Sequence, residues 1–307
     1  MGTYRIRHCK INKKNINVNS RSFAVKRKPE WLKVKFTVGE NFRDIRNIVH
    51  KHNLHTVCEE AHCPNQSECW ERRAATFMIL GDTCTRSCRF CAVNSGNPNP
   101  IDKDEPKNVG RAVKLMGLKY CVITSVTRDD LYDGGAEIWA ETISEIKRQN
   151  PDCKVEVLIP DFKGNNDALE TVLNAKPDVL GHNLETIKDL YPAARPQANY
   201  EQSLCVLRES KKRGAITKTG IMVGLGETKE QVLELMQDAI DAGCDIFTAG
   251  QYLQPTKNHL LIDRYVHPNE FEFYKTEGLR MGFRAVMSGP LVRSSYHADE
   301  QVNLLGF

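Results

Sequence analysis

The sequence lacks any long apolar run, and this absence excludes a transmembrane helix, which needs about 20 consecutive apolar residues. It also lacks a sustained G-X-Y or heptad repeat, which excludes collagen-like and coiled-coil chains. Residues 1–28 contain no acidic side chain, yet no apolar segment typical of a secretory signal follows their basic residues. The remaining composition is ordinary, with 40% hydrophobic and 27% charged residues among 307. We therefore expect a folded globular chain.

Several catalytic motifs are also missing. No G-x-x-x-x-G-K-[ST] occurs, so nothing supports nucleoside triphosphate chemistry. There is no G-x-S-x-G elbow and no H-E-x-x-H zinc motif, and the nine histidines show no paired ligand spacing. Gly224-Leu-Gly226 lacks the rest of a G-x-G-x-x-G fingerprint and is only a weak sign of a ligand-binding loop. Hydrolytic and nucleotide-dependent reactions are therefore disfavoured.

The charge distribution separates a basic head from a mildly acidic body. Residues 1–28 carry nine Lys and Arg, which leaves 34 basic against 39 acidic side chains in the rest. Such a head could bind nucleic acid or an acidic partner, could target an organelle, or could be a solvated tail. We expect a solvated tail, because the segment has no clear amphipathic period, and we predict neither a nucleic-acid nor a membrane partner.

The eleven cysteines are unevenly distributed. Six fall within 34 residues: Cys58, Cys63, Cys69, Cys84, Cys88 and Cys91. An odd total without a secretory signal indicates a reducing compartment, where clustered thiols are more often metal ligands than disulfides. The scattered five are best interpreted as small buried hydrophobic residues. We expect a cytoplasmic location, or an organelle matrix if residues 1–26 are a presequence.

Short β-rich runs alternate with helical patterns after about residue 75. The predicted strands are 76–81, 120–125, 155–159, 178–182, 219–223 and 245–249. The predicted helices are 106–117, 136–149, 167–175, 201–213, 229–242 and 268–281. This alternation indicates parallel βαβ units with right-handed connections, in an open sheet or a partial barrel. In a barrel of this kind the chemistry gathers at the carboxyl ends of the strands.

The segment after the first predicted strand holds a C-x3-C-x2-C triplet, Cys84-Thr-Arg-Ser-Cys88-Arg-Phe-Cys91. Three thiolates so close can share an iron–sulfur cluster and leave one iron of a [4Fe–4S] cube open, whereas structural zinc needs a fourth ligand that is not nearby. The triplet resembles that of the radical S-adenosylmethionine (SAM) superfamily. The resemblance implies that the amino and carboxylate groups of SAM chelate the open iron, and that reductive cleavage yields a 5′-deoxyadenosyl radical.

A second triplet, C-x4-C-x5-C, contains Cys58, Cys63 and Cys69. From the residues alone, a zinc site completed by His55 or His62 is the alternative to a cluster. The strings at 54–65 (LHTVCEEAHCPN) and 289–298 (GPLVRSSYHA) resemble the lipoyl synthase family. Shorter similar stretches lie at 27–33, 127–135, 158–162 and 224–228, so the resemblance runs from residue 27 to about 298.

This resemblance implies an auxiliary [4Fe–4S] cluster on the second triplet, with a serine of the Arg-Ser-Ser-Tyr motif as fourth ligand. Ser295 is favoured over Ser294, although the sequence alone does not choose between them. A hard serine oxygen suits a soft iron–sulfide cube poorly. Such a displaceable ligand fits a cluster that is consumed as the sulfur source.

Four further segments are candidates for binding SAM. Asp133-Gly134-Gly135 follows the second strand, where the superfamily binds the SAM amino group; a simple turn is the alternative. Glu156 lies in the third strand, and a buried carboxylate there needs a partner such as the SAM ribose or ammonium. Asn183 ends the fourth strand. Arg195 follows it and is suited to a carboxylate, although a surface ion pair is also possible.

The resemblance as a whole implies an α/β fold, a partial (β/α)6 barrel. We expect a basic tail (1–26), an extension with the auxiliary cysteines (27–75), the barrel (76–288) and a closing segment (289–307).

The implied reaction is radical insertion of two sulfur atoms at C6 and C8 of an octanoyl chain on a carrier-protein lysine, with no acid–base catalytic residue. Implied partners are the E2 subunits of 2-oxoacid dehydrogenases, the glycine cleavage H protein, and an electron donor such as ferredoxin or flavodoxin. A biotin-type sulfurtransferase and a non-enzymatic electron carrier or zinc module are the alternatives.

Overall fold

An eight-stranded sheet organises the computed structural model, which describes residues 27–34, 38–52 and 54–303. The strand order is β1-β2-β5-β6-β7-β8-β9-β10, so neighbours in the sheet follow one another along the chain. β1 pairs antiparallel with β2, and the other seven strands are parallel. The strands are β1 (His55–Thr56), β2 (Thr76–Ile79), β5 (Tyr120–Ser125), β6 (Lys154–Leu158), β7 (Val179–Gly181), β8 (Thr217–Val223), β9 (Ile246–Gln251) and β10 (Ala285–Gly289).

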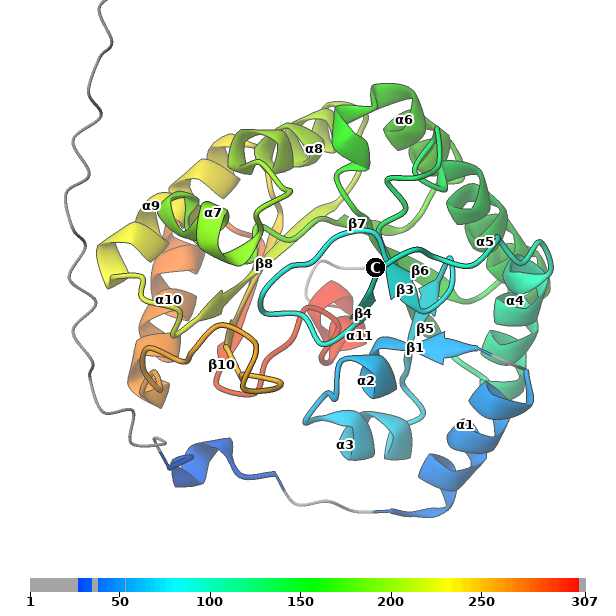
Figure 1. The fold of residues 1–307 in the computed structure, drawn as a ribbon, viewed down its shortest axis with the longest axis horizontal. Coiled ribbons are helices and arrows are strands. Elements are labelled where there is room, and N and C mark those ends of the chain that lie inside the picture. Colours follow the sequence, from blue (N-terminus) through cyan, green and yellow to red (C-terminus); the bar gives the residue numbers. More distant parts are fainter. Residues whose placement is uncertain (1–26, 35–37, 53, 304–307) are drawn as a thin grey trace, which may run out of the picture.

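Helices lie outside the curved sheet, so the architecture is an open α/β barrel (Figure 1). The main helices are α4 (Glu105–Met116), α5 (Ala136–Gln149), α6 (Asn166–Asn174), α8 (Tyr200–Lys212), α9 (Lys229–Asp241) and α10 (Pro268–Met281). All six predicted strands and all six predicted helices are confirmed, with bounds shifted by a few residues. β10 was not predicted, because its five residues end in a polar Ser-Gly pair and show no run of β-branched side chains.

Local signals explain why the predicted helix bounds agree with the structure. Thr228 and Gln231 form a reciprocal capping box at the start of α9. The Asn199 side chain accepts the N–H of Gln202 at the start of α8. Gly117 ends α4 in the left-handed region, at φ 65°, where a residue without Cβ is unstrained.

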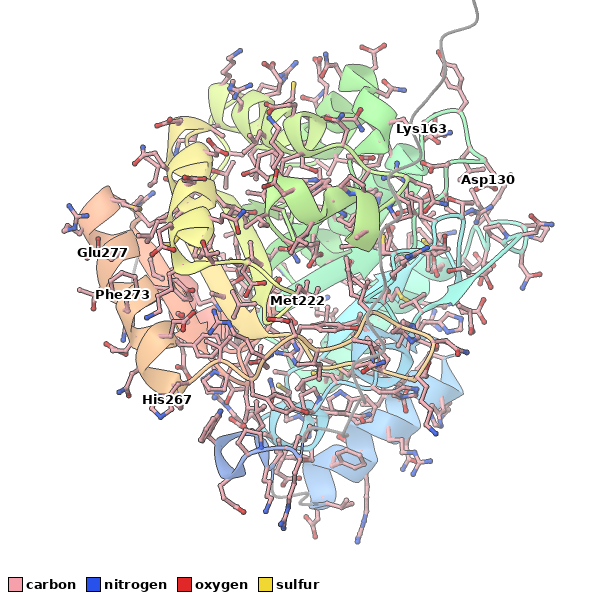
Figure 2. All side chains as sticks on the ribbon, turned by 60° about the vertical axis from the view of Figure 1, so that its left-hand side comes forward. Asp130, Lys163, Met222, His267, Phe273 and Glu277 are labelled. Carbon is pink, nitrogen blue, oxygen red and sulfur yellow. The ribbon has the colours of Figure 1, made fainter. Side chains whose placement is uncertain are left out.

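The core lies between the sheet and its outer helices. Ile79, Ile123 and Val157 of three adjacent strands are completely buried, and so is Trp139 of α5. Near-continuous apolar strands are typical of parallel sheets that are covered on both faces. Figure 2 shows α10 on the outside of the barrel, with Phe273 and Glu277 along it.

The segment before the barrel forms α1 (Glu40–Lys51), α2 (Val57–Glu60) and α3 (Gln66–Glu71). Phe42 of α1 packs on Trp70 of α3, with ring centroids 5.0 Å apart. Trp70 is completely buried, so the extension is joined to the barrel through a common core.

The C-terminal segment returns into the ring of strands. Its last helix, α11 (Ala298–Asn303), contacts both β5 and β10, which lie far apart in the sheet order (Figure 1). A Cβ atom on Gly250 of β9 would lie 2.0 Å from the Val292 carbonyl oxygen, so only glycine admits the segment here. Among the described residues, no helix has the length and apolarity required to span a bilayer.

Candidate functional site

The first cysteine triplet begins where β2 ends in a sharp turn. Leu80 and Gly81 both have positive φ, 70° and 90°. The carboxylate of Glu105 accepts the N–H groups of Leu80, at 2.7 Å, and of Gly81, at 3.4 Å. These bonds stabilise a conformation that is unfavourable for leucine. The turn directs the chain into the cysteine loop, at the carboxyl end of the strand.

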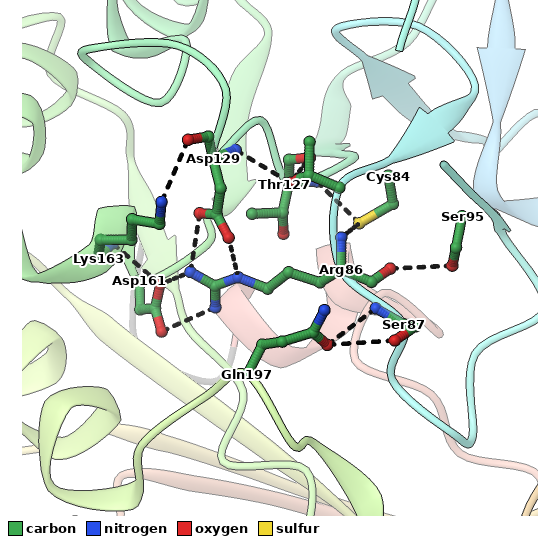
Figure 3. A network of polar contacts seen from close by, with 10 residues as sticks. Cys84, Arg86, Ser87, Ser95, Thr127, Asp129, Asp161, Lys163 and Gln197 are labelled. Atoms are coloured by element: carbon green, nitrogen blue, oxygen red, sulfur yellow. Dashed lines mark hydrogen bonds and ion pairs between the residues drawn. The ribbon is translucent and has the colours of Figure 1, made fainter. Parts of the chain in front are cut away.

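A buried arginine fixes the loop between the first two cysteines (Figure 3). Arg86 donates to Asp129 at 2.7 and 3.0 Å and to Asp161 at 2.6 and 3.0 Å. Burial alone would raise the pKa of Asp161, but the hydrogen bonds and charge of Arg86 outweigh it and lower the pKa to about 2. The two aspartates come from the loops after β5 and β6, so one side chain joins three loops at the barrel rim.

The thiols of the first triplet face this fixed loop. The Sγ atom of Cys84 accepts the N–H groups of Arg86, at 3.4 Å, and Thr127, at 3.3 Å. Burial, followed by the neighbouring thiols, raises the pKa of Cys91 to about 12, and burial raises that of Cys88. Buried thiols of this kind ionise when a metal supplies positive charge, so the donor set fits an iron–sulfur cluster.

Arg195 lies beside the first triplet. Its guanidinium neighbours Cys88, and it donates to the Asn183 carbonyl oxygen at 3.0 Å and to the Tyr191 hydroxyl at 3.1 Å. Its Nε–H is buried and has no hydrogen-bond partner within the described chain. Arg195 is therefore a buried cation with unused donor capacity next to a proposed cluster ligand.

Glu156 has a partner from the chain itself. Its carboxylate accepts the Lys218 ammonium at 2.8 Å and the Tyr120 hydroxyl at 2.6 Å, and Glu156 and Lys218 are both about 1% exposed. Glu156 was predicted to contact SAM because a buried carboxylate needs a charged partner. In the structure Lys218 is already that partner.

The Asp133–Gly135 turn caps α5 and packs between two loops. The Asp133 carboxylate accepts the N–H groups of Gly135 and Glu137, both at 2.9 Å. A Cβ atom on Gly135 would lie 2.5 Å from Leu80, so glycine permits close packing against the turn that begins the cysteine loop. A pocket of about 220 Å³ adjoins this turn and the Arg86 network, and Lys163 lines it (Figures 2 and 3).

The second triplet lies on and around α2 and α3 in the extension. Burial, followed by the neighbouring Cys63, raises the pKa of Cys58 to about 12. Burial, followed by Cys58 and Cys63, raises the pKa of Cys69 to about 12. The three thiols are therefore close enough to affect one another, and Arg293 lies beside Cys63.

The C-terminal segment is fastened to the same helix, α3. The Asn65 side chain donates to the Leu291 carbonyl oxygen at 2.7 Å. The Tyr296 hydroxyl donates to the Glu68 carboxylate at 3.0 Å. Arg72 pairs with Glu300 at 2.6 Å. These contacts hold residues 291–300 against the helix that carries Cys69.

The two serines of the Arg-Ser-Ser-Tyr motif have different surroundings. The Ser294 hydroxyl exchanges hydrogen bonds with the Asn183 side chain at 2.8 and 3.1 Å. Ser295 has no side-chain hydrogen bond within the described ranges, and it is only half-buried. Asn183 in turn accepts from Arg195, so Ser294 links the closing segment to the surroundings of the first triplet.

The described thiols can also be compared with the geometry of single-ion sites. In the part of the chain that the structure describes, no three His, Cys, Asp or Glu side chains are grouped to hold one ion. Tetrahedral zinc, with Zn–S bonds of about 2.3 Å, needs sulfur atoms within about 4 Å of each other. A [4Fe–4S] cube binds its thiolates through separate irons and therefore accepts a wider spacing.

Sequence reasoning missed the residues that hold the two loops in place. Arg86, Asp161 and Glu105 fix the first triplet, and Asn65 and Glu68 fix the closing segment. The position of Arg86 inside a cysteine triplet was the available signal, because a charge so near a cluster must be paired.

Comparison with family models gives two matches. Residues 78–239 match the radical SAM superfamily, and residues 7–63 match the N-terminal domain of lipoyl synthase of the radical SAM family. The second match begins inside the basic head, for which the sequence motifs offered no counterpart.

Curated relatives cover most of the chain. A lipoyl synthase from Rubrobacter xylanophilus is 56% identical over 89% of this chain and 86% of the relative. The lipoyl synthase of Halalkalibacterium halodurans is 53% identical over 90% of this chain and 92% of the relative.

Solved structures support the fold alone, because their sequence identity is low. Streptococcus suis SuiB bound to S-adenosylmethionine has a TM-score of 0.56 at 12% identity, over 72% of this chain and 52% of that one. The hydrogenase maturase HydG from Carboxydothermus hydrogenoformans has a TM-score of 0.54 at 13% identity, over 87% of this chain and 78% of that one.

Proposed function

The chain belongs to the lipoyl synthase family of the radical SAM superfamily, and from this premise we propose which residues hold each cofactor and receive the carrier protein. It is a sulfurtransferase that inserts two sulfur atoms, at C6 and C8, into an octanoyl chain carried on a protein lysine. Its cofactors are SAM and two [4Fe–4S] clusters.

Cys84, Cys88 and Cys91 hold the cluster that binds SAM. The support is their shared loop at the carboxyl end of β2, the N–H donors to Cys84, and the cation of Arg195 beside Cys88. Three ligands leave one iron for SAM.

Cys58, Cys63, Cys69 and Ser295 hold the auxiliary cluster. The observation that supports this assignment is the fastening of residues 291–300 to α3, the helix that carries Cys69, although more than 220 residues separate the two segments in sequence. Ser294 is engaged with Asn183, which leaves the Ser295 hydroxyl as the available ligand.

Arg195 is the preferred SAM contact among the predicted set, and Asn183, whose side chain is bonded to Ser294, lies beside it. A buried guanidinium with an unused N–H suits the SAM carboxylate. Asp133, Gly134 and Gly135 stay candidates for the SAM amino group, and the Asp133 carboxylate fixes their turn. The paired state of Glu156 supports a role in holding the barrel interior rather than a direct contact.

The chain's own residues position reactants and exclude water. An unactivated C–H bond offers neither an acidic proton nor an electrophilic carbon, so acid–base side chains have little to contribute. When bound, the cofactors supply the radical and the sulfur. The link from Ser294 through Asn183 to Arg195 couples the two triplets, and α11 covers the barrel interior. Such positioning holds C6 and C8 near both cofactors.

The activity is tested anaerobically with reconstituted protein, SAM, dithionite and an octanoyl-lysine peptide, read by mass spectrometry. We expect a dithiolated peptide together with 5′-deoxyadenosine and methionine. SAM cleavage with an untouched peptide would leave the superfamily assignment and overturn the substrate.

Two variants separate the roles of the triplets. Cys88→Ala should abolish SAM cleavage, because the first cluster loses a ligand. Cys63→Ala should cleave SAM without inserting sulfur. Formation of 5′-deoxyadenosine by the first variant, or of lipoyl product by the second, contradicts these assignments.

The substrate is an octanoylated carrier domain, either the E2 subunit of a 2-oxoacid dehydrogenase or the glycine cleavage H protein. Arg27 and Lys28 of the extension are exposed, as is Lys33, which pairs with Glu30, and these cations steer an acidic carrier; Lys26 lies outside the described residues. Neutralising these cations should raise KM for the carrier without changing SAM cleavage, and an unchanged KM contradicts the steering role.

Three further assignments belong to the same proposal. The electron donor is a ferredoxin or flavodoxin, and the location is cytoplasmic. The domain bounds are those expected from the sequence, 27–75 for the extension, 76–288 for the barrel and 289–307 for the closing segment, after the tail 1–26.

A further inference from the structure

The loop that follows β9 is fastened to the first cysteine loop. The Nε2–H of His259 donates to the Cys91 carbonyl oxygen at 2.8 Å, while its Nδ1 accepts the Thr256 hydroxyl at 2.8 Å. The Leu260 N–H donates to the Arg89 carbonyl oxygen at 2.9 Å. The two loops therefore form one surface above the last two ligands of the triplet.

This surface exposes two unpaired cations and one apolar side chain. Arg89 and Lys257 are exposed, and neither makes an ion pair with another described residue. Leu261 follows Leu260, whose N–H bonds the Arg89 carbonyl oxygen, and its side chain is 53% exposed. Two other arginines of the loops, Arg128 and Arg264, already form ion pairs, with Asp130 and Glu270. We call Arg89, Lys257 and Leu261 the basic patch.

The proposed function requires electrons from outside the chain, and the inference that follows rests on that function. Each SAM cleavage takes up one electron through the first cluster. Arg89 is two residues from Cys91, and the loop bearing Lys257 is bonded to the Cys91 carbonyl oxygen, so both loops of the basic patch are joined directly to a proposed ligand of that cluster.

We propose that the basic patch is the docking surface for an acidic one-electron carrier protein. One electron leaves the reduced carrier, which is oxidised by one electron, and reduces the first cluster by one electron. No bond forms or breaks and no proton moves. Two unpaired cations and one exposed leucine on loops that are bonded to each other suit the small, polar contact and electrostatic steering of transient redox partners.

The attachment of the patch favours an electron carrier over the acyl carrier. Both loops that form the patch are bonded to the first cysteine loop, and no hydrogen bond or ion pair joins the side chains of Arg89 or Lys257 to the described part of the extension. The cations proposed to steer the acyl carrier lie on the extension instead.

The test compares Lys257→Glu with Lys275→Glu. Lys275 is a matched control, because it is an exposed lysine without an ion pair on α10, outside the barrel. The probe is a purified acidic [2Fe–2S] ferredoxin. Its dissociation constant for the reconstituted protein is measured by titration calorimetry in the oxidised state, and the rate of cluster reduction by stopped-flow absorbance in the reduced state.

We expect Lys257→Glu to weaken ferredoxin binding about tenfold at low salt and to slow reduction in proportion, while Lys275→Glu changes neither. Dithionite-driven SAM cleavage should be the same in both variants and in the unaltered protein. Arg89→Gln combined with Lys257→Glu should weaken binding further.

Two results would overturn the docking surface: equal ferredoxin affinity in Lys257→Glu and the unaltered protein, or no binding by the unaltered protein. A raised KM for the octanoylated carrier with unchanged ferredoxin binding would assign the patch to the acyl carrier instead. Loss of dithionite-driven SAM cleavage in the unaltered protein would refute the proposed function, which the binding measurement does not depend on.

Discussion

At the scale of single residues, neighbouring side chains of the same type have different tasks. The Ser294 hydroxyl is bonded to Asn183, whereas Ser295, the next residue, has no such partner among the described side chains. The backbone of the closing segment turns here, and the Tyr296 N–H donates to the Arg293 carbonyl oxygen at 2.9 Å. In this turn the Ser294 hydroxyl is bonded to Asn183, and the Ser295 hydroxyl is left to bind a cluster.

Ser295→Ala should keep the first cluster and SAM cleavage but lose lipoyl product, because the auxiliary cluster lacks its fourth ligand. Ser294→Ala is the matched control and should retain the auxiliary cluster, since it loses only the bond to Asn183. Mössbauer spectra and product mass spectrometry distinguish the two variants. Lipoyl product from the first variant together with a damaged auxiliary cluster in the second would exchange the roles.

His182, at the carboxyl end of β7, predicts a pH dependence of stability. Its ring is buried; Nδ1 lies 2.9 Å from the Ile159 carbonyl oxygen and Nε2 has no partner in the described chain. Burial, followed by the charge of Arg195, lowers the pKa of His182 to about 4. Its folded-state pKa is thus below its unfolded value of about 6.5, so the unfolded chain binds the proton first as pH falls.

The stability that depends on neutral His182 should be fully present above about pH 6.5 and should be lost as pH falls toward 4, by about 3 kcal/mol in all. Urea denaturation of metal-free, reduced protein at pH 7, 6 and 5 measures this slope. His182→Gln should flatten the slope over that range. An equally steep slope in the variant would mean that other groups cause it.

At the scale of elements, the closing segment enters the barrel because two strands carry glycine. A Cβ atom on Gly220 of β8 would lie 3.0 Å from the Ser294 hydroxyl, and one on Gly250 of β9 would lie 2.0 Å from the Val292 carbonyl oxygen. The Val292 carbonyl is a backbone group and cannot move aside like the end of a flexible side chain, whereas the atoms nearest a Cβ on Gly220 are side-chain oxygens, with Thr248 Oγ1 at 2.3 Å. These strand positions therefore determine where the Arg-Ser-Ser-Tyr motif lies.

Gly250→Ala should displace the closing segment and lower the iron content by about half, through loss of the auxiliary cluster alone. SAM cleavage should persist. Ser288→Ala, on the neighbouring β10, is the control, because its buried hydroxyl has no partner to lose among the described residues. Unchanged iron content and product formation in Gly250→Ala would show that the segment tolerates a shift.

At the scale of the whole molecule, the N-terminal extension and the C-terminal closing segment are joined by polar contacts. Glu68 accepts from Tyr296 and lies 3.0 Å from His297, and Arg72 pairs with Glu300. These side chains are partly exposed, so each ion pair contributes at most about 1 kcal/mol. Together with the bond from Asn65 to the Leu291 carbonyl oxygen, these contacts fasten the closing segment to α3 and its ends.

Replacing Glu68 and Arg72 together by Gln should raise amide hydrogen exchange across residues 291–303 while leaving the barrel strands unchanged. Lys188→Gln is the control, since it breaks an exposed ion pair with Glu201 elsewhere on the rim. Exchange that stays the same across 291–303 in the double variant would mean that the contacts of Glu68 and Arg72 do not hold the segment.

Much of the fold could be predicted from the sequence because its signals are local. Capping residues such as Thr228, terminal glycines such as Gly117 and apolar strand runs are read within a few positions, so the barrel elements were predicted closely. β10 was missed because it ends in a polar Ser-Gly pair and shows no run of β-branched side chains. The cysteine spacings are local as well: the first triplet predicted a cluster, and the resemblance of the surrounding motifs implied the second.

The sequence by itself determined the element order, the two cysteine triplets and, through similarity of motifs, the family. Only the tertiary structure decided the partners of charged side chains: Arg86 with Asp129 and Asp161, Glu156 with Lys218, and Arg195 beside Cys88. It also decided which serine is already engaged. The physical reason is that ion pairing and hydrogen bonding depend on distances of a few ångströms between residues far apart in sequence, whereas helix capping, strand burial and ligand spacing are properties of neighbouring residues.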